Sequence, residues 1–443
     1  MKASHSVTNT TALDVLRHPK GWIIPSIVLS IAILAISIVF TGSAANPAAD
    51  LRDAPIGLVN LDQGATLGEQ QMNLGDQVLD GIQQQPTDAV SWQLFDSEDE
   101  MRAAFADNAL YASIVLPTDF TVKLSSLTGN TPARPDVQVL GNDGAGSVAA
   151  SIGETIAESA VKAASSYAAG VVASYSPAAI PAANALLVSD PVTISLGDGV
   201  DMGARTGNGM TAFFYALLLM MVGFLGANLI NGMVDSELGF NPSEIGPRRR
   251  VMRPSPISRT QTYLAKAAIL AIASLPTSAV ILFVGAVVMK LDLPNPFLMW
   301  LFGIASIIAI GLGTLTVVTI LGSLGIVIGM IFFIGWSIPV SGGAIPLHAM
   351  PAFWRFLATF EPMRAVVDGV RAIMYFGASG AAGLERGWIL LAIGAALAIA
   401  AGIGLNHLYD RRGMHRIHPM ALAHIDEFVT RIPQHEDPKA AVH

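Results

Sequence analysis

The sequence predicts an α-helical polytopic membrane protein with six transmembrane helices and an extracytoplasmic α/β domain inserted between the first and second of them. Two observations support this prediction. Of the 443 residues, 52% are hydrophobic and only 13% are charged, whereas soluble domains contain about 25% charged residues. The apolar residues also gather in long uncharged runs, as in helices that cross a bilayer. This composition excludes intrinsic disorder, which requires low hydrophobicity and high charge.

Other features of the composition exclude whole classes of function. The chain contains no cysteine, so disulfides, thiolate metal sites and cysteine nucleophiles are absent. The net charge of −8 argues against nucleic acid as a main partner. The sequence contains no G-x-x-x-x-G-K-[ST] loop, H-E-x-x-H helix or G-x-S-x-G elbow. We therefore expect no catalytic residue, no metal site and no cofactor in this chain.

The first predicted span covers residues 22–41. Its apolar run, Trp22–Phe40, has 19 residues without a charge. As a helix, such a run reaches about 28 Å, close to the roughly 30 Å of a bilayer core. A secretory signal peptide with a cleavage site at residues 43–45 is the alternative. The run is longer than the typical signal, which has about 7–15 apolar residues.

Four further apolar runs predict the other five spans. Residues 210–233 and 263–289 each suit one helix, and residues 388–408 suit the last. The run 297–340 contains 44 residues without a charged side chain. It is too long for one helix and fits two. We place the turn between them in the glycine-rich residues 321–325, because glycine weakens a helix.

Charge asymmetry predicts which segments face the cytoplasm. Residues 42–209 hold six Lys or Arg against 20 Asp or Glu. Basic residues gather instead between the second and third spans, at Arg248, Arg249, Arg250, Arg253 and Arg259. Three more follow the last span, at Arg411, Arg412 and Arg416. Because basic flanks stay in the cytoplasm, we predict that residues 1–21, 234–262 and 409–443 lie inside, and that residues 42–209 and 341–387 lie outside.

The outside insert alternates strand-like and helix-like segments. Four strands are predicted, at residues 55–62, 90–95, 110–116 and 136–140. Helices are predicted from Leu67 to Gln84 and after Ser97, where Ser97 and Glu100 can form a capping box. A long helix covers residues 147–175. Its apolar stripe is Val148, Ile152, Ile156, Ala160, Ala163, Tyr167, Val171 and Tyr175.

Two arrangements of the long helix are open. It packs on its own domain, or it forms a stalk that pairs with a second protomer. The prolines Pro177, Pro181 and Pro191 then predict a linker that returns to the membrane.

The segment 341–387 carries charges next to the membrane. Pro351 and Pro362 each suit the first turn of a short helix. In the second helix Arg364, Asp368 and Arg371 fall at i, i+4 and i+7, with Glu361 three residues before Arg364, and opposite signs at these spacings can pair. The segment is predicted to be a re-entrant hairpin that dips in from outside, or a hairpin on the membrane surface. It is expected to act as a gate or only as a plug.

Polar residues within the spans are few. Lys266 is expected to extend its ammonium group to the inner interface. Asn228 and Asn231, at i and i+3 in the second span, are predicted to join helices to one another. No chain of intramembrane Asp, Glu or His predicts a proton relay.

Two stretches resemble a known family. Ser341-Gly342-Gly343-Ala344-Ile345-Pro346, followed by residues 361–371, is similar to the "SGG-x-(F/I)-P … P-(M/F)-x-x-A-V-x-x-(L/V)-R" ending of ABC-2-type membrane proteins. Residues 56–64 resemble the "V-A-V-V-N-x-D-x-G" strand of the YhgE/Pip (phage infection protein) branch. The order of one span, a large outside domain and five spans also matches. Typical YhgE/Pip chains carry a long outside coiled coil, and this insert is short.

The resemblance implies a bacterial cell-membrane protein that works as a homodimer, or as a heterodimer with a related chain, with a separate cytoplasmic ATPase. It implies an in-plane elbow helix at Thr10–Lys20 and a coupling contact to the ATPase within Ser236–Thr260. The arginines Arg248, Arg249, Arg250 and Arg253 either serve this coupling or only enforce topology and touch anionic lipid.

Two functions are consistent with these observations. The first is the permease subunit of an exporter that moves an amphipathic substrate, such as a lipid, glycolipid, peptide or drug. The alternative is a non-transporting envelope protein, either a scaffold for a secretion machine or a surface receptor of the phage-receptor type. A secondary transporter is disfavoured, because neither an inverted repeat nor a midplane pair of ionisable residues is evident.

Overall fold

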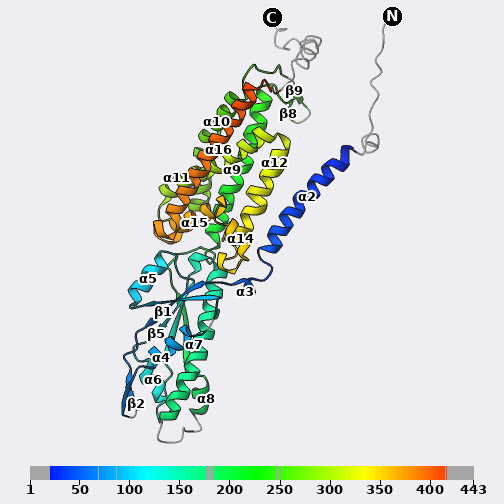
Figure 1. Ribbon diagram of the computed structural model, residues 1–443. Helices are drawn as coiled ribbons and strands as arrows, with labels where there is room; N and C mark the ends of the chain where they lie inside the picture. The colour runs from blue at the N-terminus through cyan, green and yellow to red at the C-terminus, as the bar shows by residue number, and fades with distance from the viewer. Residues whose placement is uncertain are drawn as a thin grey trace, which may run out of the picture.

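The computed structural model describes residues 20–416, apart from 68, 86, 176–180, 182–183, 246–247, 251 and 415. The molecule is elongated, with a helical bundle at one end and a sheet domain at the other (Figure 1). The helices labelled α2 and α16 have their Lys20 and Arg411 ends at the end of the bundle far from the sheet domain. We call this the tail end. The predicted elbow helix at Thr10–Lys20 lies, except for Lys20, outside the described residues.

Within the described residues, six helical segments are long and apolar enough to cross a membrane, which confirms the predicted number. They are α2 (Lys20–Gly42), α9 (Met210–Glu237), α10 (Arg259–Phe283) with η3 (Val284–Val288), α11 (Pro296–Leu321), α12 (Ser323–Met330) with η4 (Ile331–Trp336) and α13 (Ser337–Val340), and η6 (Gly380–Leu384) with α16 (Glu385–Arg411). The helix α9 continues four residues beyond the predicted end of its span, and α10 begins four residues earlier than predicted. The turn predicted at 321–325 is confirmed, because Gly322 takes a positive φ of 65° between α11 and α12.

The bundle is built around α11. This helix packs against α9, α10 and α16, and its glycines allow close approach: a side chain at Gly311 would overlap Leu270 of α10. The helix α2 lies to one side and packs chiefly against η4 (Figure 1). There Ile36 fills the space that a Cβ atom at Gly335 would need.

The sheet domain has five strands: β1 (Ala54–Asn60), β4 (Val90–Phe95), β5 (Ala112–Leu116), β6 (Asp136–Gly141) and β7 (Thr193–Asp198). Their order is β4-β1-β5-β6-β7, and only the pair β5 and β6 is antiparallel. The four predicted strands are confirmed. The prediction of a linker after Pro191 is wrong at β7, which pairs with β6 in the register Asp136↔Thr193. This strand lies at the sheet edge and is only half-buried, so its hydrophobic alternation is weak.

The shorter elements differ from the prediction near residue 67. A hairpin of β2 (Ala65–Leu67) and β3 (Gln70–Met72) replaces the first turns of the predicted helix, and α4 (Leu74–Gln83) begins after the Asn73 cap. In α5 (Glu98–Ala106) the predicted cap is confirmed, because Ser97 Oγ accepts from the Glu100 amide at 3.2 Å. The Glu100 carboxylate accepts from the amide of Asp96, one residue before the cap. In the part of the chain that the structure describes, the remaining elements outside the hairpin of residues 341–379 are α3 (Pro47–Asp50), α6 (Phe120–Ser126), η1 (Asp143–Ala145), α8 (Ala185–Ser189), β8 (Ser243–Ile245) and β9 (Arg248–Arg250).

The long helix α7 (Ser147–Tyr175) is confirmed, and it packs on its own domain, against α4, β5 and β6. The predicted stripe is wrong in part. Val148 and Tyr167 are 39% and 73% exposed. The buried face is offset from the predicted one and rich in small residues: Ala149, Ala157, Val161, Ala164 and Ala168. Small side chains let the helix lie close to the sheet, as at Gly153, where a Cβ atom would come within 2.8 Å of Ala112.

Candidate functional site

The hairpin predicted within 341–387 consists of η5 (Leu347–Ala349), α14 (Ala352–Leu357) and α15 (Pro362–Tyr375). The helix α15 lies at the sheet-domain end of the bundle, packed against α9, α11 and α16 (Figure 1). Pro362 is its first residue, as predicted, whereas Pro351 is the N-cap of α14. Both faces of α15 are buried, so the helix is held inside the molecule.

Glu361 is the N-cap of α15. Its Oε2 accepts from the amides of Met363 at 2.7 Å and Arg364 at 3.2 Å, and its Oε1 accepts from the Ser337 hydroxyl of α13. The carboxylate therefore serves the backbone of Arg364, and the guanidinium group of Arg364 reaches Asp368 instead. Burial raises the pKa of Glu361 to about 7, although these hydrogen bonds lower it.

The stability of the protein is expected to fall between about pH 5 and pH 8, and less so in the variant Glu361→Gln. Because the folded pKa is raised from 4.5 to about 7, the folded chain holds a proton that the unfolded chain releases, and stability is lost as the pH rises through this window. The effect has an upper limit of about 3 kcal/mol. Melting temperatures of both proteins in one detergent at both pH values test this. Equal pH slopes would contradict the prediction.

Asp368 links α15 to the last span. It lies 3.5 Å from Arg364, the predicted i, i+4 pair, and 3.6 Å from Arg386 of α16. The predicted contribution of Arg371 to this ladder is wrong. Arg371 is buried and donates to the carbonyls of Gly342 at 3.2 Å and Gly343 at 3.0 Å. Burial raises the pKa of Asp368, and the neighbouring arginines oppose this shift.

The motif Ser341-Gly342-Gly343 has a structural explanation. Gly342 has a φ of 73°, a conformation that favours glycine. A side chain at Gly343 would overlap Phe213 of α9. The two glycines therefore turn the chain so that both carbonyls face Arg371.

The sheet domain rests on the hairpin. The Tyr111 hydroxyl lies 2.7 Å from Nδ1 of His348. Gly146 has a φ of 109°, and a Cβ atom there would lie 2.6 Å from a guanidinium nitrogen of Arg371. A cavity of about 590 Å³ opens at this junction, which we call the hairpin cavity. Its lining includes Tyr111, His348, Arg364, Asp368, Arg371 and Arg386.

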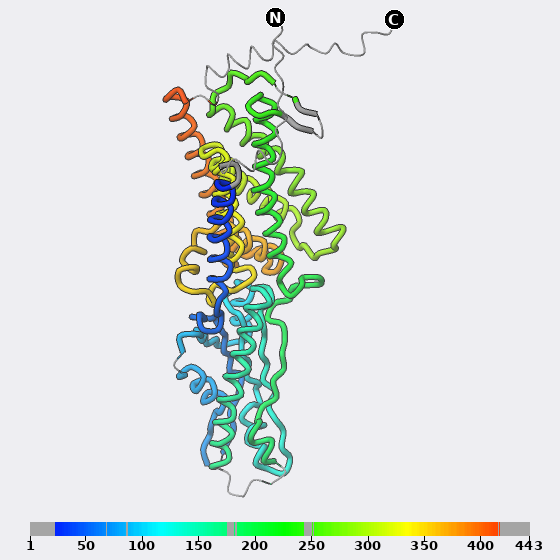
Figure 2. The backbone as a smooth tube through the Cα atoms, turned by 90° about the vertical axis from the view of Figure 1, so that its right-hand side faces the viewer, coloured from blue at the N-terminus to red at the C-terminus, as the bar shows by residue number. Residues whose placement is uncertain are grey.

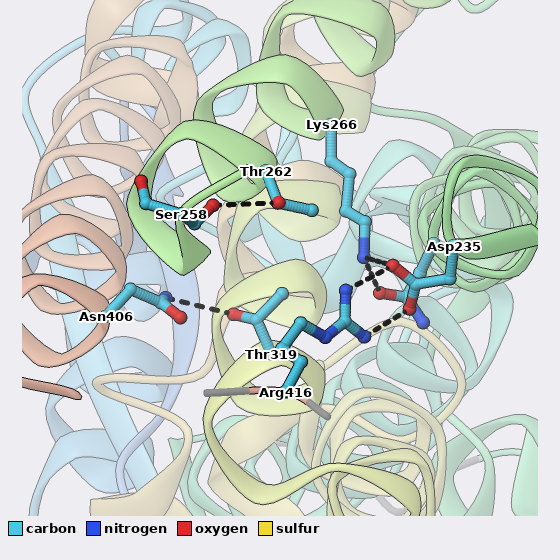
Figure 3. A network of polar contacts seen from close by, with 8 residues as sticks. Asp235, Ser258, Thr262, Lys266, Thr319, Asn406 and Arg416 are labelled. Atoms are coloured by element: carbon cyan, nitrogen blue, oxygen red, sulfur yellow. Dashed lines mark hydrogen bonds and ion pairs between the residues drawn. The ribbon is translucent and has the colours of Figure 1, made fainter. Parts of the chain in front are cut away.

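A second polar centre lies at the tail end of the bundle (Figure 3). Lys266 of α10 donates to Asp235 of α9 at 2.5 Å, and Arg416 donates to both oxygens of the same carboxylate at 2.6 and 2.7 Å. The expectation that Lys266 extends to the interface is wrong, because its side chain is 0% exposed. Arg416 also lies over the Phe240 ring, 4.4 Å from its centroid.

The two predicted intramembrane asparagines behave differently. Asn231 Oδ1 accepts from Lys266 at 2.7 Å, so it does join α9 to α10. Asn228 donates to Phe224 of its own helix at 2.8 Å, and this bond joins no helices. Asp235 was missed because it follows the apolar run of the second span. Asn231 and Asp235 are four residues apart and therefore lie on one helix face, and this spacing is the signal in the sequence that could have found Asp235.

The tail centre surrounds a cavity of about 530 Å³, the tail cavity. Its polar lining includes Asp235, Lys266, Arg259, Thr319, Asn406 and Arg416. Next to it along α11 and α12 lies an apolar pocket of about 380 Å³, lined by residues that include Val317, Ile328, Phe332 and Phe333. Asp410 of α16 closes the same end of the bundle, because it accepts from the amides of Arg259 and Thr260.

The predicted coupling arginines lie beside this end. Arg248, Arg249 and Arg250 form β9, which pairs with β8 in an antiparallel hairpin. Arg250 and Arg253 are exposed. The hairpin follows α9, which runs from the sheet domain to the tail end of the bundle (Figure 2). Its role in coupling stays a prediction.

Comparisons with known proteins place the chain in a family. A family model described as "ABC-2 family transporter protein" matches residues 20–403. The chain therefore belongs to the ABC-2 transporter family, which confirms the resemblance seen in its motifs. It is also 25% identical, over 135 residues, to the "Uncharacterized protein YhgE" of Bacillus subtilis (strain 168). That stretch is 30% of this chain and spans only 17% of the relative. No solved structure matches the chain.

Proposed function

We propose that this protein is the membrane-spanning permease subunit of an exporter, and that its substrate is amphipathic: a lipid, glycolipid, peptide or drug. The observation that supports this most strongly is a polar cavity at each end of a six-helix bundle, with an apolar pocket beside one of them. A substrate with a polar and an apolar part matches such a path. The scarcity of charge elsewhere in the spans disfavours a hydrophilic ion.

The energy source in this proposal is a separate ATPase, because the sequence lacks a phosphate-binding loop. Membrane proteins of this family generally work with a cytoplasmic ATPase. Arg250 and Arg253, exposed in and after β9, supply a basic surface for an acidic partner. Charged patches of this kind steer and orient protein partners.

Purification from the native host is expected to recover an ATPase subunit with the chain, while the pure chain alone hydrolyses no ATP. Replacing Arg248, Arg249 and Arg250 together by glutamate should lower the recovered ATPase at least about tenfold, because opposed charges become like charges. Arg412→Glu, at another exposed position of the tail end, is the control. Undiminished recovery in the triple variant would leave those arginines with a topological role only. ATP turnover by the pure chain would refute the proposal of a separate ATPase.

The proposed orientation places the sheet domain outside and the tail end in the cytoplasm. Since the chain has no cysteine, single cysteines report sidedness cleanly. An impermeant thiol reagent in intact cells should label Ser151→Cys, exposed on α7, and should label Arg412→Cys only after the cells are opened. Labelling of Arg412→Cys in intact cells would show that the orientation is the opposite of the proposed one.

An envelope scaffold or surface receptor is the second candidate function. The exposed Val148 and Tyr167 on α7 favour it, because they present apolar surface that the domain does not use itself. The same face would serve a homodimer or a heterodimer with a related chain. A Tyr167→Cys variant that forms a disulfide-linked homodimer in the membrane would assign the face to a second copy. A variant that loses export but still binds the partners of α7 would show that the exporter and the scaffold or receptor functions are separate.

A further inference from the structure

The tail cavity and the apolar pocket lie one helical turn apart along α11 and α12. We infer that together they form one site that binds an anionic lipid, with the headgroup in the tail cavity and an acyl chain in the apolar pocket. The inference deepens the proposed function by naming its substrate class, and it rests on that function only for the claim that the bound lipid is then moved.

Charge identifies the headgroup. Three cationic side chains, Lys266, Arg259 and Arg416, line the cavity against one carboxylate, Asp235. Both oxygens of Asp235 are already engaged by Lys266 and Arg416 (Figure 3). The cavity therefore has a surplus of positive charge in a chain whose net charge is −8.

Lys266 has a donor to spare. An ammonium group carries three N–H donors. Its contacts with Asn231 and Asp235 use two of them. Because the side chain is fully buried and lines the cavity, the third donor is available to a ligand within it. A phosphate oxygen is the acceptor that best matches a buried ammonium beside guanidinium groups.

The apolar half of the site distinguishes a lipid from a free anion. Ile320 and Ile326 line the tail cavity, and Thr316 and Gly329, one helical turn away on the same two helices, line the apolar pocket, so the two hollows are adjacent along both α11 and α12. A soluble phosphate would fill only the polar half. A lipid covers both halves, and in the proposed orientation it enters from the cytoplasmic leaflet, where anionic lipids are enriched.

The test uses the purified full-length protein in nanodiscs. Ser323 lines the tail cavity and is exposed, so a fluorophore on Ser323→Cys reports occupancy. The probes are phosphatidylglycerol and phosphatidylcholine, each spin-labelled in the acyl chain as a quencher. Each basic group that faces an anionic headgroup contributes about fivefold in affinity. We therefore expect phosphatidylglycerol to be preferred about 25-fold, and Arg416→Gln and Arg259→Gln each to lower that preference about fivefold.

Matched variants separate this site from the general basic surface. Arg412→Gln, exposed at the same end of α16, should leave the preference unchanged, and Arg416→Lys, which keeps the charge, should largely retain it. An equal loss in Arg412→Gln, or no preference at all, would overturn the inference. Displacement by inorganic phosphate as effective as by unlabelled phosphatidylglycerol would also overturn it, in favour of a free-phosphate site. Because no ATPase takes part in this test, lipid binding here together with failure to recover any ATPase from the native host would refute the exporter and leave this site standing. Transport of another substrate, with no lipid preference in the binding test, would refute this lipid site and leave the exporter standing.

Discussion

Asp235→Ala is expected to lower the free energy of unfolding by about 3–5 kcal/mol, because removal of one partner strands a buried charge. Lys266 has no exposed surface, and its two hydrogen bonds within the spans go to Asp235 and Asn231. The loss of Asp235 also removes both hydrogen bonds that Arg416 donates to α9, so Arg416 no longer holds the end of the chain after α16 against that helix. Thermal unfolding in detergent, followed by light scattering and tryptophan fluorescence, measures the effect.

Two further variants control this experiment. Glu237→Ala, exposed and half a turn further along α9, should change stability by less than about 0.5 kcal/mol. The double variant Asp235→Leu with Lys266→Met should recover most of the loss, because a buried pair replaced by apolar residues of similar volume is close to neutral. If Asp235→Ala unfolds at the same temperature as the wild-type protein, the ion pair contributes nothing to stability, and its assignment as a stabilising contact is wrong.

Arg371→Met is expected to cost about 2–4 kcal/mol, because it leaves the buried carbonyls of Gly342 and Gly343 without their donor. Arg371→Lys should recover only part of this, since a single ammonium does not match two carbonyls as a planar guanidinium does. Arg355→Met, on the neighbouring α14, is the matched control and should be nearly neutral.

Stability and export measured together on Arg371→Met decide what the hairpin does. Parallel loss of both would indicate a plug that only fills the end of the bundle. If Arg371→Met loses export but is at least as stable as Arg371→Lys, the hairpin acts as a gate at the hairpin cavity. A variant that keeps wild-type stability and export would show that the contact with Gly342 and Gly343 carries neither role.

The features of the fold that were predictable are those with a local period. Long apolar runs define the spans, and four strands are recognisable from alternation and turn residues. The edge strand β7 was not predictable, because half of its side chains face solvent and its pairing partner, β6, ends about fifty residues earlier in the chain. The stripe of α7 was misplaced because its buried face consists largely of alanine, which carries little hydrophobic signal.

The site shows the same division. The Arg364–Asp368 pair followed from helical spacing alone. The partners of Arg371 are backbone carbonyls about thirty residues earlier in the chain, which no side-chain pattern reveals. Asp235 and Lys266 lie on different helices, and Arg416 comes from the tail after the last span. Contacts of this range depend on how the helices pack.

The sheet domain is attached to the bundle at one end only. Its chain enters β1 from α2 and leaves β7 for α9, so both covalent connections lie at the base, beside the hairpin, and α7 runs from that base to the far tip (Figure 1). A helix of 29 residues is about 44 Å long. A tilt of about 10° where Gly146 meets Arg371 therefore moves the tip by about 8 Å. A rearrangement of α15 that tilted the domain by this angle would therefore move its far end by a distance that a distance-sensitive probe, or a binding partner, would register.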